Sequence, residues 1–135
     1  MDNPKKPIPV VNEWARPFWE AAREHKLLIQ RCGDCGKYIF YPRMCCPECF
    51  SSSLVRVESS GRGVIYSFTI VENNPPSAFL GDLPYVIAIV RLEEGVQMLS
   101  NIVDWDSKTL RCDMPVTVTF EKLDEEFTLP KFKPL

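Results

Sequence analysis

The chain has 135 residues, of which 45% are hydrophobic and 25% are charged, a composition typical of one ordinary globular domain or two very small ones. No apolar run approaches the 18 residues that a membrane-spanning helix needs, so we expect no membrane segment. Residues 1–60 hold nine Lys or Arg and seven Asp or Glu, whereas residues 61–135 hold seven Lys or Arg and eleven Asp or Glu. The acidic C-terminal half disfavours nucleic-acid binding, because that binding needs a positively charged surface.

The N-terminal segment is predicted to be an extended arm. Residues 1–11 are rich in proline and polar residues, and they contain no apolar core or cleavage pattern of a signal peptide. Because no targeting signal is seen and the chain relies on reduced cysteines, we expect a cytoplasmic protein.

A helix is predicted over residues 13–25, with Pro17 in its first turn, where a missing N–H costs nothing. Trp14 and Phe18 recur at helical spacing, and Trp19 lies beside them. A chain this small has little core to cover so many rings. We therefore expect these three aromatic side chains to contact a partner protein. Residues 1–25 form the first predicted unit.

Two CxxC pairs follow the helix and are the most specific chemical signal in the chain. Ten residues separate the pairs. Four thiolates arranged in this way are typical of a closed tetrahedral zinc site, which leaves no open position for water. One zinc ion is therefore expected to stabilise the fold rather than to catalyse a reaction. The predicted ligands are Cys32, Cys35, Cys46 and Cys49.

Cys45 leaves the register of the second pair open. Cys46 gives the spacing that matches the first pair, so Cys45 is either a spare thiol or the ligand in an alternative register. A disulfide or a redox pair is the competing interpretation, but these need an oxidising compartment or a βαβ context. Cys112 stands alone and is expected to be a small buried apolar residue.

Between residues 26 and 53, two predicted strands alternate with the two CxxC turns, which we call knuckles. This order is the pattern of a zinc ribbon. The strands are predicted at 27–31 and 37–41. This segment has almost no apolar core of its own, so bound metal is expected to supply its stability.

From residue 54 to residue 123 the sequence predicts only β-structure. Alternating apolar and polar residues indicate half-buried strands, and Glu94-Gly95 is typical of a tight hairpin turn. Five short strands after a ribbon favour a small Greek-key barrel of the OB type, with a mixed sandwich as the weaker alternative. The fold class is thus mainly β: an N-terminal helix, a four-cysteine zinc ribbon, then a five-stranded OB-fold barrel. The strands are expected at 54–58, 63–71, 85–93, 96–103 and 116–123.

Two further segments do not fit a self-contained barrel. The loop 72–84 is long and has an apolar tip, Phe79-Leu80, which we expect to contact a partner. The C-terminal tail, residues 124–135, carries apolar residues between charges and prolines. The tail either folds back on its own domain or docks on another chain.

The sequence contains no credible catalytic set. His25 is the single histidine and is expected to be a solvated surface residue. No nucleophile elbow, phosphate-binding glycine loop or dinucleotide fingerprint is present. We therefore expect no catalytic residues in this chain.

The chain resembles a known family, DUF35, over most of its length. Members of that family combine an N-terminal helix, a rubredoxin-like zinc ribbon and an OB-fold. The extra Cys45 departs from the family pattern. The segments that carry the resemblance are FWEAAR at 18–23, LLIQRCGDCG at 27–36, YPR at 41–43, CPEC at 46–49, GRGVIYSFT at 61–69, PYVIA at 84–88 and NIVD at 101–104.

The resemblance implies a partner rather than a reaction. Proteins of this family are typically small subunits of thiolase-fold enzymes, including the benzoylsuccinyl-CoA thiolase of anaerobic toluene degradation. The partner chain holds the catalytic residues, and the small subunit helps bind or enclose coenzyme A of an acyl-CoA in a hetero-oligomer. If coenzyme A is contacted, cations should meet its phosphates, and the candidates are Arg43, Arg62 and Lys37. The alternatives are an OB-fold protein that binds single-stranded nucleic acid and a pure scaffold.

Overall fold

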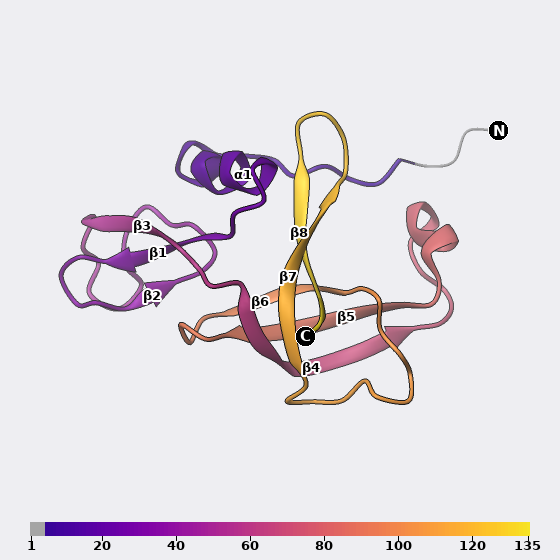
Figure 1. Cartoon of the computed structure of the whole chain (residues 1–135). Coiled ribbons are helices and arrows are strands. Elements are labelled where there is room, and N and C mark those ends of the chain that lie inside the picture. Colours follow the sequence, from indigo (N-terminus) through magenta and orange to yellow (C-terminus); the bar gives the residue numbers. More distant parts are fainter. Residues whose placement is uncertain (1–4) are drawn as a thin grey trace.

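The computed structural model describes residues 5–135 and shows a short helix, a small three-stranded sheet and a closed five-stranded barrel (Figure 1). The predicted fold class is confirmed. The first four residues of the predicted extended arm lie outside the described range. Because apolar residues from all three parts pack together, one hydrophobic cluster joins the helix, the small sheet and the barrel.

The N-terminal helix is shorter than predicted. A 3₁₀ turn, η1 (Glu13–Ala15), leads into α1 (Arg16–Arg23), and the Asn12 side chain accepts a hydrogen bond from the Ala15 N–H at 3.1 Å. The helix ends before His25 because that residue has a positive φ of 60°. None of the helices in the described part of the chain is long and apolar enough to cross a membrane.

The ribbon sheet has the order β2-β1-β3, with β1 at Leu28–Cys32, β2 at Tyr38–Ile39 and β3 at Leu54–Glu58. All five residues of β3 pair with β1 in antiparallel register, from Leu28 opposite Glu58 to Cys32 opposite Leu54. The segment that we expected to be the first barrel strand therefore completes the ribbon instead.

The barrel closes in the order β4-β5-β6-β8-β7. Its fifth strand, β8, comes from the C-terminal segment, for which the sequence predicts a tail that folds back or docks elsewhere. The turn at Glu94-Gly95 lies between β5 and β6 as predicted, with Gly95 at φ 96°. The strand bounds are β4 Arg62–Val71, β5 Tyr85–Leu92, β6 Gln97–Ile102, β7 Pro115–Lys122 and β8 Thr128–Pro134.

The sequence did not predict β8 because the segment contains prolines, and proline cannot donate a hydrogen bond to a β-ladder. Pro130 and Pro134 nevertheless lie opposite β7 residues. On its other side β8 has only one paired position with β6, Phe132 opposite Ile102. A strand with one largely free side tolerates proline as an edge strand does, and Phe132 anchors it by being fully buried.

The aromatic residues of the N-terminal helix have three different environments. Phe18 is only 3% exposed and packs in the shared core, so our expectation that it contacts a partner is corrected. Trp19 is half-buried against the same core, and Trp14 remains exposed. Helical spacing does not reveal this burial, because the barrel that covers Phe18 is built from residues far along the chain.

The long loop between β4 and β5 contains a second 3₁₀ helix, η2 (Ser77–Asp82). Phe79 is half-buried and lies 6.1 Å from the Tyr85 ring, whereas Leu80 is exposed. Of the predicted apolar tip, only Leu80 is therefore largely available on the surface of this chain.

A hydrogen-bonded joint connects the ribbon to the barrel. The Ser59 N–H donates to the Leu27 carbonyl at 2.8 Å, and the Ser59 hydroxyl donates to Glu94 at 2.8 Å. Gly61 follows with φ 77°, and a Cβ at this position would lie 2.4 Å from the Val118 side chain. Both parts are held through this joint, so the ribbon has a defined position beside the barrel.

Candidate metal centre and the adjacent groove

The four predicted cysteine ligands come together between the two knuckles of the ribbon. Their sulfur atoms all lie within 4.8 Å of one another. The Cys32 and Cys49 sulfurs are 3.5 Å apart, and the Cys35 and Cys46 sulfurs are 3.6 Å apart.

This geometry fits a tetrahedral zinc ion. Zn–S bonds of about 2.3 Å place sulfurs about 3.8 Å apart at the corners of a tetrahedron. The two measured separations are close to that value. Cys32, Cys35, Cys46 and Cys49 would therefore hold zinc with four sulfurs, in a closed structural site.

Electrostatics also favour a cation among these sulfurs. The backbone N–H of Cys35 points at the Cys32 sulfur at 3.4 Å and lowers the pKa of that thiol to about 6. The backbone N–H of Ser51 likewise favours the Cys49 thiolate, but the neighbouring Cys32 sulfur and burial outweigh it and raise the pKa of Cys49 to about 12. Four thiolates this close repel one another, and a divalent ion is what allows all four to ionise together.

The positions of Cys45 and Cys46 decide which of the two belongs to the cysteine cluster. Cys46 is buried and faces the other three sulfurs, whereas Cys45 is exposed and lines the adjacent groove. Cys112 is also exposed, which corrects our expectation that it is a buried apolar residue. It lies just before Asp113, which has a positive φ of 65°, in the connection that leads into β7.

Polar contacts brace the two knuckles against each other. Lys37 pairs with Glu48, and the Ser51 hydroxyl donates to the Asp34 carboxylate. The pKa of Lys37 is raised and that of Glu48 lowered, chiefly by the hydrogen bond between the two side chains. Lys37 is thus occupied by a neighbour within its own ribbon.

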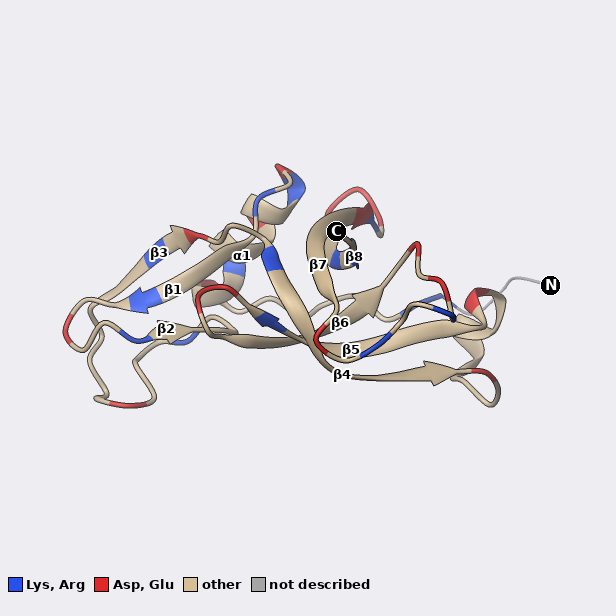
Figure 2. Ribbon diagram, turned by 60° about the horizontal axis from the view of Figure 1, so that its bottom comes forward, with Lys and Arg blue, Asp and Glu red and all other residues tan. Residues whose placement is uncertain are grey.

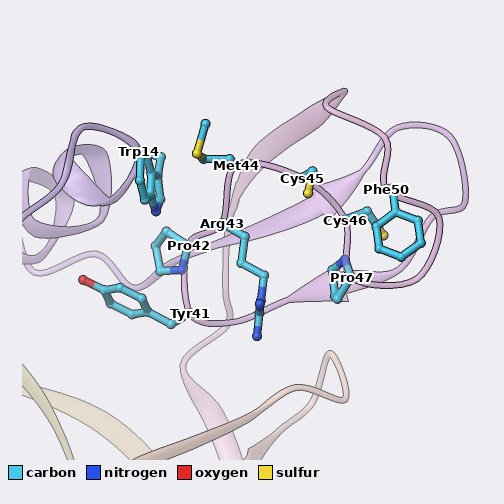
Figure 3. Close-up of a pocket in the computed structure, with 9 residues that line it drawn as sticks. All are labelled: Trp14, Tyr41, Pro42, Arg43, Met44, Cys45, Cys46, Pro47 and Phe50. Atoms are coloured by element: carbon cyan, nitrogen blue, oxygen red, sulfur yellow. The ribbon is translucent and has the colours of Figure 1, made fainter.

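An open groove of about 610 Å³ lies between the η1 turn and the second knuckle (Figure 3). Its walls are mainly apolar, and two of its residues are strongly exposed: Met44 at 65% and Phe50 at 78%. Single exposed apolar residues are ordinary, but several around one groove indicate a binding surface. The lining residues are Trp14, Tyr41, Pro42, Arg43, Met44, Cys45, Cys46, Pro47 and Phe50.

Aromatic contacts fix one wall of this groove to the barrel. The Trp19 indole N–H donates to the Tyr41 hydroxyl at 2.9 Å, and the Phe18 ring lies 5.4 Å from the Tyr41 ring. On its other side Trp19 packs edge-to-face against Phe127, just before β8, at 5.5 Å. Trp19 therefore connects the groove to the barrel rather than offering a free surface.

Gln30 on β1 holds the groove loop at Arg43. Its side-chain amide donates to the Arg43 carbonyl at 3.1 Å and accepts from the Arg43 N–H at 2.8 Å. Since Gln30 is buried, these two bonds replace water at both atoms. The loop that carries Arg43 is thereby fixed to the ribbon sheet.

We expect Gln30→Ala to lower the free energy of unfolding by about 1–3 kcal/mol, because the Arg43 backbone groups lose their buried partners. The exposed Gln97→Ala on β6 is the matched control and should change stability by less than about 0.5 kcal/mol. Denaturant unfolding of both variants measures the difference. Equal effects of the two substitutions would contradict the role given to Gln30.

The three predicted cationic residues are not brought together at one surface. Arg43 lines the groove, and Figure 3 shows its side chain extending between Tyr41 and Pro47. Within residues 5–135 its guanidinium has no ion-pair partner, whereas Arg62 lies 3.6 Å from Glu93 and does not line the groove. Sequence reasoning missed the apolar residues around Arg43, because Met44 and Phe50 follow no helical or strand periodicity.

The described residues show no second candidate metal site. The cysteine set is the one group of three or more potential metal ligands found among residues 5–135. His25 is exposed, as expected, and its ring stacks on Phe120 at 5.1 Å.

Comparisons with known proteins agree with this architecture. A model of the rubredoxin-like zinc ribbon domain of ChsH2 matches residues 19–55, and a model of the ChsH2 C-terminal OB-fold domain matches residues 56–121. A "DUF35 domain-containing scaffold protein" of Methanothermobacter thermautotrophicus is 35% identical over 118 residues, covering 87% of this chain and 88% of that protein. The chain belongs to the DUF35 family.

Other relatives of this DUF35 chain carry names of enzyme subunits. A "probable enoyl-CoA hydratase alpha subunit" of Thermomonospora curvata is 36% identical over 129 residues, 96% of this chain. The chain spans only 40% of that relative's length. The "benzoylsuccinyl-CoA thiolase subunit BbsA" of Geobacter metallireducens is 31% identical over 93 residues, which cover 66% of this chain and 58% of that subunit.

A solved structure gives the same fold. A chain of the "Ltp2-ChsH2(DUF35) aldolase" superposes with a TM-score of 0.84 at 36% identity, covering 94% of this chain and 98% of that one. The DUF35 chain therefore has a zinc ribbon and an OB-fold, in a family whose members are named as scaffolds and as subunits of thiolase, aldolase and hydratase enzymes.

Proposed function

We propose that this chain is a non-catalytic accessory subunit that docks on a thiolase-fold catalytic chain in the cytoplasm and helps enclose the coenzyme A part of an acyl-CoA. The observation that carries this proposal is the groove beside the metal centre, where an arginine without an ion-pair partner among residues 5–135 lies among exposed apolar side chains. A relative named as a thiolase subunit supports the choice of partner.

The groove matches the chemistry of coenzyme A. The ligand has a long, mostly neutral arm and several phosphates. Met44 and Phe50 offer apolar contact to the arm, and the Arg43 guanidinium offers charge-assisted hydrogen bonds to a phosphate. The groove is open on one side, so a second chain is needed to enclose a ligand there.

The closed metal centre restricts how the subunit contributes to a reaction. Zinc held by four sulfurs has no free position for a substrate, so its part is to hold the knuckle that carries Arg43 and Phe50. The subunit would then act by positioning the acyl-CoA and by excluding water from the partner's site.

Purification of the tagged chain from its native cell tests the partner. A thiolase-fold chain in near-stoichiometric amount is expected among the bound proteins. Recovery of the chain alone, or with nucleic acid instead of a thiolase-fold chain, would overturn the proposal. Bound single strands that dissociate with rising salt would support the OB-fold nucleic-acid binder in its place.

Arg43→Ala in the purified complex is expected to weaken coenzyme A binding about tenfold or more, because a charge-assisted hydrogen bond contributes roughly 1.5–3 kcal/mol. Arg62→Ala is the matched control, since Arg62 faces Glu93 away from the groove. Titration calorimetry with coenzyme A measures both dissociation constants. If Arg43→Ala leaves coenzyme A affinity unchanged in an intact complex, the chain is a scaffold without contact to coenzyme A.

A further inference from the structure

The outer face of the barrel strands β4, β5 and β6 has an uncharged, partly apolar centre, and its side chains are not covered by any part of residues 5–135. An antiparallel strand with one face in water normally alternates apolar and polar residues. Residues 85–90 of β5 instead read Tyr-Val-Ile-Ala-Ile-Val without a charged residue. The inward positions 86, 88 and 90 are buried in the core. The outward positions include Ile87 and Ile89, which remain half-exposed. Such a continuous apolar run is typical of a strand that is covered on both faces.

The neighbouring strands extend this face without adding charge. Ile89 pairs with Ser67 on β4 and with Leu99 on β6. Ile87 pairs with Thr69 on β4 and with Asn101 on β6. Leu99 is 69% exposed. We call these six side chains, of which Ile87, Ile89 and Leu99 are apolar, the outer sheet face. It belongs to different elements from those that line the groove beside the metal centre.

Acidic residues border one end of the outer sheet face. Glu72 follows β4 and Asp104 follows β6, at the end where Val86 pairs with Ile102. Figure 2 shows Asp and Glu residues in the loops that leave this end of the barrel. The two loops are acidic on balance, and Lys6 of the N-terminal arm pairs with Asp82. Their charged residues are Glu72, Asp82, Asp104, Asp106, Lys108, Arg111 and Asp113.

This charge distribution selects the kind of partner. A second copy packed in the same orientation would bring like charges together at the border, whereas Lys or Arg on a different protein would complement them. Nucleic acid requires a row of cations, but Arg91 at the edge of the face lies over the Tyr66 ring at 4.5 Å and forms no such row. We propose that the outer sheet face docks on a partner protein through an apolar patch that is bordered by Lys or Arg. The chain then has two separate surfaces, the groove and the barrel face.

Two substitutions on the face test this docking surface. Leu99→Glu places a charge at the most exposed apolar side chain of the face. It is expected to weaken binding of the co-purified partner at least about tenfold, because a buried unpaired charge is costly. Thr69→Glu is the second variant; it removes no buried group, since Thr69 is exposed. Val55→Glu on the ribbon edge, where Val55 is 53% exposed, is the matched control and should bind as the wild type does.

Replacing Leu99 with the photo-crosslinking residue benzoylphenylalanine identifies the segment of the partner that contacts the face. The expected crosslink is to an apolar segment of the partner flanked by Lys or Arg. Affinity should fall with added salt, and it should fall less steeply when Glu72→Gln and Asp104→Asn remove the border charges. Unfolding temperatures equal to that of the wild type show that a weakened variant is folded.

Three results would overturn this proposal: partner affinity unchanged by both Leu99→Glu and Thr69→Glu, a crosslink between two copies of this chain, or a crosslink to nucleic acid. The partner in this test is the chain recovered under the proposed function, so the inference rests on that proposal, but the two can fail separately. If Arg43→Ala lowers coenzyme A affinity while both face variants bind the partner normally, the proposal for the outer sheet face is wrong and the proposal for the groove is supported.

Discussion

Replacing Cys46 with serine is expected to release the zinc ion and unfold the ribbon, whereas the same change at Cys45 leaves both intact. The buried cluster of the ribbon consists of Cys32, Ile39 and Cys46, with Leu54 packed against it. Such a small apolar cluster cannot hold a fold by itself. Structural zinc contributes on the order of 10–16 kcal/mol in small modules, so its loss exceeds what the remaining contacts can offset.

Zinc content and far-ultraviolet circular dichroism measure this outcome for the two serine variants. About one zinc per chain is expected in the wild type and in Cys45→Ser, and much less in Cys46→Ser. Retention of zinc by Cys46→Ser together with its loss from Cys45→Ser would show the alternative register. Because the groove is carried by the second knuckle, Cys46→Ser should also abolish coenzyme A binding by the complex.

Truncating Phe132 to alanine is expected to lower the free energy of unfolding by about 3–5 kcal/mol. Phe132 is fully buried on β8, between β6 and β7, and its loss would leave a cavity inside the barrel. Leu135→Ala is the matched control, because Leu135 lies three residues further along and is 75% exposed. Its effect should stay below about 0.5 kcal/mol.

Denaturant unfolding of the Phe132→Ala and Leu135→Ala variants measures this difference directly. Small and equal effects would mean that the C-terminal segment is a loosely attached tail rather than the fifth barrel strand. Unchanged slopes of the unfolding curves would show that both variants lose stability without a change in the exposed surface.

Features with a local signature were predictable from the sequence. The spacing of the cysteines depends on the geometry of a knuckle, so it indicated the ligand set before any fold was known. Alternation from Val116 to Phe120 indicated β7, and the Glu94-Gly95 pair indicated the turn between β5 and β6. Each of these signals lies within a few residues of the structure that it predicts.

Other features depended on contacts between distant parts of the chain. The sequence predicted five barrel strands, but it assigned residues 54–58 to the barrel and missed residues 128–134. Both segments are short and apolar enough to be strands, and only their partners, β1 for the first and β7 for the second, decide where they belong. Prolines in β8 further masked a strand that tolerates them because its other side is nearly unpaired.

The candidate site divides in the same way. By itself the sequence predicted a four-cysteine metal site, with the choice between Cys45 and Cys46 left open, and it determined the two-part architecture and the family, because these rest on short motifs in a fixed order. Only the tertiary structure decided that Phe18 is core, that Arg43 lies in an apolar groove, and that Leu99 belongs to an uncovered sheet face. The physical reason is that burial is set by what packs against a side chain, and those neighbours come from residues far away along the chain.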